Sequence, residues 1–118
     1  MMEVKCKRGD IYMAELSADE DGGSLQQGVR PILIISNDKA NLYSPVVTVV
    51  PFTSKLRKHS LPTHVLVKAC GLERPSLVLA EQIMSLNKTR LGKRMGSIKE
   101  TIYEPQVDQA LKIQLNMQ

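Results

Sequence analysis

The sequence predicts a β-dominated α+β fold, a small SH3-like β-barrel followed by a C-terminal amphipathic helix. Short aliphatic and β-branched runs, separated by polar segments with Gly or Pro, recur as far as Ile83 and are typical of strands. After Thr101 the apolar residues recur with a helical period instead. Strands with long polar loops and one terminal helix are the pattern of a small barrel that a helix covers.

Five runs are expected to form strands: Ile11 to Leu16, Ile32 to Ile35, Val46 to Val50, His64 to Val67, and Ser76 to Ile83, which carries Glu81 and Gln82. Ile32 to Ile35 has no polar alternation, so both of its faces should be covered. Pro31 cannot donate to a ladder and should be the first residue of that strand, as Pro51 should help to end the next one. Residues 39–44 are expected to connect strands, and residues 85–90 to include a short helical turn.

The last segment of the chain predicts one amphipathic helix. Thr101 is the expected N-cap, and Pro105 falls in the first turn, where proline is tolerated. The apolar stripe consists of Ile102, Val107, Ala110, Leu111, Ile113 and Leu115.

Length and composition indicate an ordinary globular protein. The 118 residues suit a single domain spanning 1–118, with 42% hydrophobic and 24% charged residues. The start lacks an apolar signal segment and no run is long enough to cross a membrane, so we expect a cytoplasmic protein without a membrane partner.

Cysteine and histidine usage argues against a metal or other cofactor. Cys6 and Cys70 lie far apart and are expected to be reduced thiols. The two histidines, His59 and His64, form no HExxH motif, so no metal site is expected. The net charge of +4 permits a polyanionic partner. Few aromatic residues are present, which disfavours an RNA-binding module that stacks bases on a sheet.

Arg30 is the first candidate functional residue. It follows a polar, Gly-containing loop and precedes Pro31, which places it at the rim of a buried strand, where an arginine can meet an anion without full burial. An ordinary surface arginine would fit the same position. The basic run from Lys88 to Lys99 is interpreted as a solvated face, and Arg8-Gly9-Asp10 as a turn into the first strand rather than an adhesion motif.

Several motifs in collinear order resemble the MazF/PemK family of toxins from type II toxin–antitoxin pairs, which are endoribonucleases also called mRNA interferases. The motifs are Arg8-Gly9-Asp10-Ile11-Tyr12, Gly28-Val29-Arg30-Pro31, Asn37-Asp38, Ser44-Pro45, Leu61-Pro62-Thr63-His64-Val65 and Glu81-Gln82-Ile83. The resemblance runs from about Lys7 to Leu115. It implies a homodimer that cleaves single-stranded RNA without metal and is inhibited by a cognate antitoxin lying in the RNA groove. It also carries the two catalytic positions of the family over to Arg30 and Thr53.

A ribonuclease without metal can use the 2′-OH of its substrate as nucleophile, leaving a 2′,3′-cyclic phosphate and a 5′-OH. The guanidinium of Arg30 would stabilise the charge that gathers on phosphate oxygens, and Thr53 would orient the 2′-OH. Candidate RNA-binding residues are Gln26, Gln27, Asn37, Ser54, Lys55, Glu81 and Gln82, whose side chains could equally make structural hydrogen bonds. Two alternatives stay open: a toxin of this architecture that poisons DNA gyrase, and a catalytically silent binding module.

Overall fold

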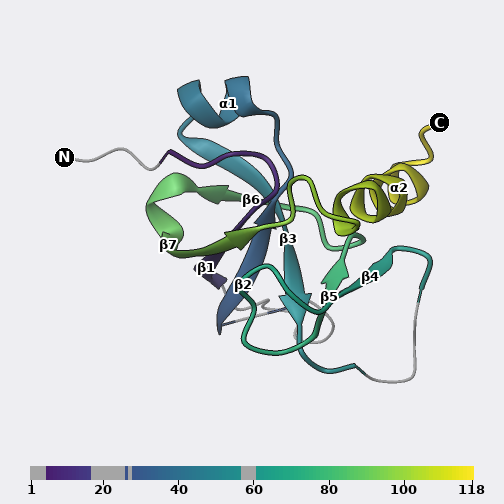
Figure 1. Cartoon of the computed structure of the whole chain (residues 1–118). Helices are drawn as coiled ribbons and strands as arrows, with labels where there is room; N and C mark the ends of the chain where they lie inside the picture. Colours follow the sequence, from purple (N-terminus) through teal and green to yellow (C-terminus); the bar gives the residue numbers. More distant parts are fainter. Residues whose placement is uncertain (1–4, 17–25, 27, 57–60) are drawn as a thin grey trace.

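The computed structural model describes residues 5–16, 26, 28–56 and 61–118 of the chain. They form seven antiparallel strands and, near the C-terminus, a helix (Figure 1). The elements are β1 (Asp10–Leu16), β2 (Gly28–Ile34), α1 (Asp38–Tyr43), β3 (Val46–Thr53), β4 (His64–Val67), β5 (Ser76–Leu79), β6 (Met84–Asn87), the 3₁₀-helix η1 (Lys88–Arg90), β7 (Leu91–Ser97) and α2 (Tyr103–Leu115). No helix in the described ranges is long and apolar enough to cross a membrane.

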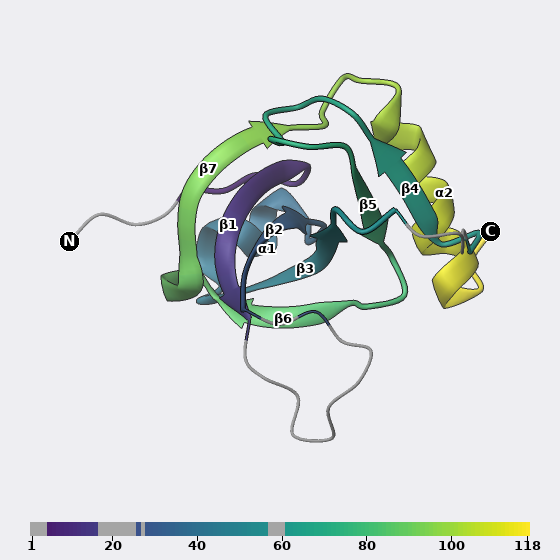
Figure 2. The same cartoon turned by 90° about the horizontal axis from the view of Figure 1, so that it is seen from below.

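The seven strands form one curled sheet in the order β4-β5-β3-β2-β1-β7, and β6 pairs with β3. Figure 2 shows β7, β1, β2, β3 and β6 curving around a common centre, while β4, β5 and α2 lie to one side of it. The predicted β-dominated α+β class with a C-terminal helix is confirmed. The word barrel applies loosely, because no ladder in the described chain joins the two end strands β4 and β7.

The sheet has a core on each of its faces. Along β2, Ile32 and Ile34 belong to the inner core and Leu33 to the outer core, and all three are 0% exposed. The prediction that this strand is covered on both faces is therefore confirmed. The inner core, inside the curl, comprises Cys6, Tyr12, Ala14, Leu16, Ile32, Ile34, Val47, Val49, Leu86 and Leu91. The outer core, under β4, β5 and α2, comprises Ile11, Leu33, Val50, Phe52, Val65, Val67, Val78, Ala80, Ile98, Val107, Ala110 and Leu111.

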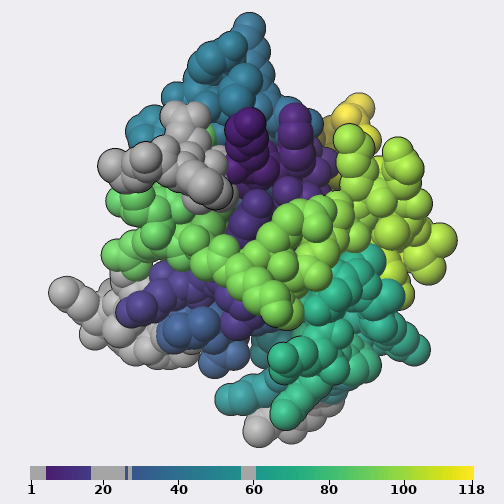
Figure 3. Space-filling model, turned by 60° about the vertical axis from the view of Figure 1, so that its left-hand side comes forward, coloured from purple at the N-terminus to yellow at the C-terminus, as the bar shows by residue number. Residues whose placement is uncertain are grey.

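Two glycines allow the β4–β5 connection to lie against β7. A Cβ added at Gly71 would lie 2.6 Å from the carbonyl carbon of Met95, and one at Gly96 would lie 2.7 Å from that of Cys70. Figure 3 shows the green residues of β7 pressed against the teal residues near 70. This backbone contact bridges the side on which the sheet stays open.

The Arg8-Gly9-Asp10 tripeptide is structural, as predicted. Gly9 has a φ of +94° in the turn before β1. Arg8 forms an ion pair with Asp108 of α2 (3.0 Å), and Asp10, 5% exposed, forms one with Arg94 of β7 (3.1 Å). The tripeptide thus ties β1 to α2 and to β7.

Both expectations about strand prolines are wrong. Pro31 lies inside β2, which begins at Gly28, and Pro51 lies inside β3, which ends at Thr53. Pro31 pairs with β1 alone, because the β2–β3 ladder begins only at Ile32. Pro51 pairs with β2 but lies between the parts of β3 that pair with β6 and β5. Each proline therefore sits where one side of its strand has no ladder to interrupt.

Three further boundaries differ from the expectations. Residues 39–44 were expected to be a connection, but the helix α1 occupies most of that stretch. The run from Ser76 to Ile83 is not one strand, because β5 ends at Leu79 and a turn containing Glu81 and Gln82 follows. By contrast, the helical turn expected within residues 85–90 is confirmed and is η1. The N-cap position of α2 is Ile102, and the neighbouring Thr101 hydroxyl accepts a hydrogen bond from the Tyr103 N–H (3.2 Å).

Candidate active site

Arg30 and Thr53 lie on the same face of the sheet, at the same end of two neighbouring strands. The β2–β3 ladder ends with Ile32 opposite Pro51, and continuing its register by two residues would bring Arg30 level with Thr53. Because side chains two apart on a strand share a face, Arg30 lies on the face of Ile32 and Ile34, that of the inner core. Arg30 is half-buried and Thr53 is 7% exposed. The strand geometry thus places a guanidinium and a hydroxyl at the end of the curl.

Thr53 is the last residue of β3 and directs the chain that follows. Its Oγ1 accepts a hydrogen bond from the Lys55 N–H (3.2 Å). A hydroxyl has one donor and two acceptor positions, so Thr53 keeps its donor and one acceptor position for other partners. Ser54 and Lys55 are exposed beside it. Three of the predicted site residues therefore cluster where β3 ends.

Gln26 and Gln82 come together from distant parts of the sequence. The Gln26 N–H donates to Oε1 of Gln82 (3.0 Å), which joins the segment before β2 to the turn after β5. Gln27, also predicted to contact RNA, lies outside the described residues. Gln82 thus contacts the segment that precedes β2, the strand that carries Arg30.

Glu81 makes two side-chain hydrogen bonds with residues at the start of β4. Its Oε1 accepts from the Thr63 hydroxyl (2.9 Å), and its Oε2 lies 2.9 Å from Nε2 of His64. The Leu61 N–H donates to Nδ1 of His64 (3.3 Å), which leaves Nε2 as the protonated nitrogen that donates to Glu81. The His64 side chain is 10% exposed and is engaged within this cluster. His59 lies outside the described residues.

Asn37 is the predicted site residue that the fold places elsewhere. It is the N-cap of α1, and its Oδ1 accepts from the Ala40 N–H (2.8 Å). Asn37 follows the far end of β2, and the strand alone separates Arg30 from that end by about 13 Å at the usual rise per residue. Asn37 is exposed. The structure therefore does not bring it to the Arg30–Thr53 end of the sheet.

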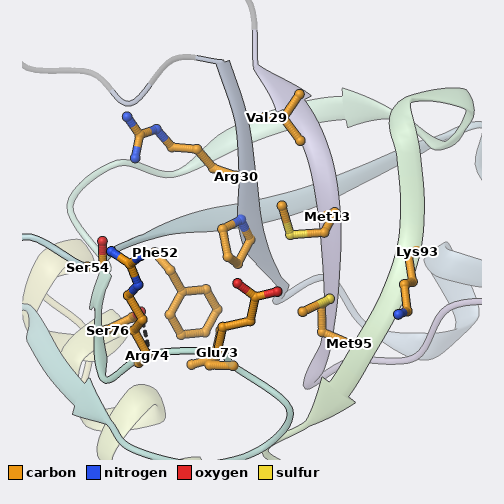
Figure 4. A pocket seen from close by; sticks show the side chains of 12 residues that line it. Met13, Val29, Arg30, Phe52, Ser54, Glu73, Arg74, Ser76, Lys93 and Met95 are labelled. Atoms are coloured by element: carbon orange, nitrogen blue, oxygen red, sulfur yellow. Dashed lines mark hydrogen bonds between the residues drawn. The ribbon is translucent and has the colours of Figure 1, made fainter.

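A cavity of about 380 Å³ borders Arg30 on the outer-core side of the sheet, where Phe52 lies, and Thr53 does not line it (Figure 4). Its walls are formed by Met13, Val29, Arg30, Pro31, Phe52, Ser54, Leu72, Glu73, Arg74, Ser76, Lys93 and Met95. Figure 4 shows Arg30 extending at its margin, while Glu73 and Lys93 reach it from the β4–β5 connection and from β7. The lining of the cavity mixes apolar side chains with charged and hydroxyl-bearing ones. Sequence reasoning missed Glu73, Arg74 and Lys93.

Neither cysteine is suited to act as a nucleophile. Cys6 and Cys70 are free thiols, and burial raises the pKa of both. A raised thiol pKa lowers the fraction of thiolate, which is the reactive form. In the ranges that the structure describes, no group of three or more His, Cys, Asp or Glu residues could hold a metal ion. The chemically distinctive groups of this end of the sheet are thus a guanidinium, hydroxyls and amides.

Comparison with known proteins assigns the chain to a family. Residues 7–115 match the family of PemK-like, MazF-like toxins of type II toxin–antitoxin systems. Endoribonuclease EndoA of Bacillus subtilis (strain 168) is 43% identical over 111 residues, which cover 92% of this chain and 93% of EndoA. The chain therefore belongs to the MazF/PemK toxin family.

Solved structures agree with this assignment. The Mycobacterium tuberculosis toxin MazF-mt6 is 27% identical, with a TM-score of 0.74 over 92% of this chain and 98% of that toxin. An endoribonuclease from a mycobacterial species, solved in complex with its cognate antitoxin, is 25% identical, with a TM-score of 0.76 over 97% of this chain and 96% of its own. MazF from Deinococcus radiodurans is 23% identical with a TM-score of 0.76, covers 98% of this chain and 100% of its own, and supports the fold alone.

Proposed function

We propose that this chain, an endoribonuclease of the MazF/PemK toxin family, cleaves single-stranded mRNA at specific sequences without a metal ion. The observation that carries the proposal is the register of the β2–β3 ladder, whose continuation would bring Arg30 level with Thr53 at one end of the curled sheet. In this mechanism the substrate 2′-OH loses its proton and attacks the adjacent phosphorus. The bond from phosphorus to the 5′-oxygen breaks, and that oxygen takes up a proton. The products are a 2′,3′-cyclic phosphate and a 5′-OH.

Arg30 stabilises the transition state of this reaction. Negative charge gathers on the non-bridging oxygens as the fifth bond to phosphorus forms. A guanidinium presents two parallel N–H donors to such oxygens and keeps its charge at neutral pH. Removing one such donor from an enzyme typically lowers kcat by about 10²- to 10³-fold. Arg30 is half-buried, so solvent weakens its interaction with the phosphate less than it would at a fully exposed position.

Thr53 orients the 2′-OH. Its Oγ1 already accepts the Lys55 N–H, which fixes the position of the hydroxyl near the end of β3. The remaining donor and acceptor positions can hold the 2′-OH in line with the leaving 5′-oxygen. Orientation of this kind suits an attack within one RNA strand, because nucleophile and phosphorus are already linked.

Sequence selection would come from polar side chains around this pair. Gln26, Gln27, Ser54 and Lys55 precede β2 or follow β3 and are proposed to contact bases or phosphates. Asn37 and Glu81 complete the proposed RNA-binding set, although both also make hydrogen bonds within the protein. Gln82 is a further candidate from the sequence, but its side-chain oxygen accepts the Gln26 N–H. Arg74 and Lys93 at the edge of the cavity would add attraction for phosphates.

We further propose that the toxin acts in the cytoplasm as a homodimer and is inhibited by a cognate antitoxin. The mycobacterial relative solved with its cognate antitoxin supports an antitoxin partner. The basic charge of the chain would favour an acidic antitoxin segment that competes with RNA. The whole chain, residues 1–118, is proposed to be one toxin domain.

Substitutions at the two catalytic positions test the proposal. Arg30→Ala should lower kcat about 10²-fold or more, and Arg30→Lys should recover little of it, because a point charge does not reproduce the guanidinium fork. Thr53→Val keeps the shape and removes the hydroxyl. Lys112→Ala on exposed α2 is the control for loss of a positive charge. Cleavage of single-stranded RNA at near-normal rates by the Ala or Val variant would exclude this site.

A further inference from the structure

The Gln82–Gln26 hydrogen bond joins a well-anchored turn to the segment that leads into the catalytic strand. We infer that Gln82 is a positioning residue for cleavage: its Oε1 holds the backbone at Gln26 and thereby sets Arg30 against Thr53. This inference rests on the proposed function. It gives Gln82 a role through Arg30, distinct from reading a base.

The turn that carries Gln82 is fixed by several interactions. Within it, the Gln82 N–H donates to the Leu79 carbonyl (3.0 Å), and the Ala80 N–H donates to the Thr63 carbonyl (3.0 Å). The carboxylate of Glu81 binds the Thr63 hydroxyl and His64 Nε2, both at 2.9 Å. Thr63 is 7% exposed, so these bonds are largely shielded from water. The turn is therefore a firm support for the Gln82 side chain.

The strand that receives this support is held on one side only. From Gly28 to Pro31, β2 pairs with β1, while its described ladder with β3 begins at Ile32. Gly28 has a φ of +80°, and a Cβ added there would have no atom within 4 Å. Neither a β3 ladder nor close packing around Gly28 therefore fixes this part of β2. A hydrogen bond at Gln26, two residues before β2, supplies a constraint there.

The position of Arg30 relative to Thr53 depends on this constraint. Arg30 sits two residues beyond the point at which the described β2–β3 ladder ends, and it pairs there with Ala14 of β1. Small misplacements of a catalytic group can lower the rate by as much as about 10²-fold. Loss of the Gln82 acceptor should accordingly affect the chemical step more than the binding of RNA.

Two substitutions that keep the side-chain length of Gln82 distinguish a positioning role from the reading of a base. Gln82→Met keeps the shape and removes the acceptor oxygen, while Gln82→Glu keeps an acceptor. Gln114→Met, at an exposed position of α2, is the matched control. Each variant is measured for kcat and KM on single-stranded RNA, for its cleavage sequence pattern, and for exchange of the Gln26 amide hydrogen by NMR.

Gln82→Met should speed exchange of the Gln26 amide about tenfold and lower kcat about tenfold or more, with KM and cleavage pattern little changed. Gln82→Glu should retain slow exchange and recover most of kcat, and Gln114→Met should match the wild type. A changed cleavage pattern or a rise in KM alone would show that Gln82 reads a base and would overturn the inference. Unchanged exchange in Gln82→Met would also overturn it. A wild-type protein that does not cleave RNA refutes the proposed function instead, and the exchange data then still report on the hydrogen bond.

Discussion

Replacing Gly96 with alanine tests the backbone contact between β7 and the β4–β5 connection. The Cβ would lie 2.7 Å from the carbonyl carbon of Cys70, where ordinary contacts of Cβ atoms begin at 3.4 Å. Gly96 does not have a positive φ, so alanine is compatible with its backbone conformation. The expected effect is therefore steric, and the obstructing atoms belong to backbone that cannot rotate away.

The loss of stability expected for Gly96→Ala follows from the overlap between its Cβ and the Cys70 backbone. The two backbones must separate by roughly 1 Å, which forfeits up to about half of the dispersion attraction across the contact. Overpacking in a well-packed interior typically costs 1–3 kcal/mol, and a clash between two backbones belongs at the upper end, at about 3 kcal/mol. For a chain of this length, such a loss corresponds to a fall in Tm of roughly 10 °C.

Gly92→Ala provides the matched control on the same strand. Its Cβ would lie 3.2 Å from the Met13 carbonyl oxygen, a contact that a shift of a few tenths of an ångström relieves. We expect Gly92→Ala to change the free energy of unfolding by less than about 1 kcal/mol. Urea and thermal denaturation give both values. If the two variants lose the same stability, the contact between β7 and the β4–β5 connection does not have the role assigned to it.

Four further outcomes are expected. Asp10→Ala removes the acceptor of the Lys7 N–H and the partner of Arg94, so it should lower the free energy of unfolding by about 1.5–3 kcal/mol in urea denaturation. Arg94→Gln should lower it less, because that side chain is 52% exposed; equal losses would contradict this reasoning. Glu81→Ala leaves the buried Thr63 hydroxyl without its acceptor and should cost about 1–3 kcal/mol; an unchanged urea midpoint would count against the cluster. Analytical ultracentrifugation should find a homodimer at micromolar concentration, and a monomer there would refute that proposal.

The sequence predicts best what depends on local pattern. The aliphatic run of β2 lies where the sequence places it, because burial on both faces leaves a direct trace in residue order. The stripe of α2 is predicted only in part: Val107, Ala110 and Leu111 are buried, whereas Ile102, Ile113 and Leu115 are exposed. The sequence does not predict the helix α1, because its six residues make fewer than two turns and show no helical repeat of apolar residues. Its signal was nevertheless present in Asn37 followed by Asp38, a capping residue before an acidic first turn.

Features that depend on pairing between distant segments could not be predicted in this way. The turn at Glu81 exists because β3 changes partner: Phe52 pairs with Val78 of β5, and Val49 pairs with Met84 of β6. Three residue steps along β3 thus correspond to six steps from β5 to β6, and the extra residues leave the ladder. No local pattern in Ser76 to Ile83 records this change.

The residues of the candidate site likewise fall into those that the sequence predicts and those that only the fold reveals. Arg30 could be selected from the sequence because it adjoins a recognisable strand, and Thr53 because the resemblance to the MazF/PemK family carries a catalytic position over to it. Glu73, Arg74 and Lys93 could not, because only the fold brings the β4–β5 connection and β7 to the cavity beside Arg30. Lys93 lies in a basic run that composition alone assigns to a solvated face, and that residue is indeed exposed.

The chemical nature of the RNA ends tests the central proposal most directly. Purified protein is incubated with single-stranded RNA in excess EDTA, and the termini of the products are determined by mass spectrometry. The mechanism built on Arg30 and Thr53 predicts undiminished cleavage, with a 2′,3′-cyclic phosphate on one fragment and a 5′-OH on the other. Loss of cleavage in EDTA, or products that carry a 5′-phosphate, would contradict it.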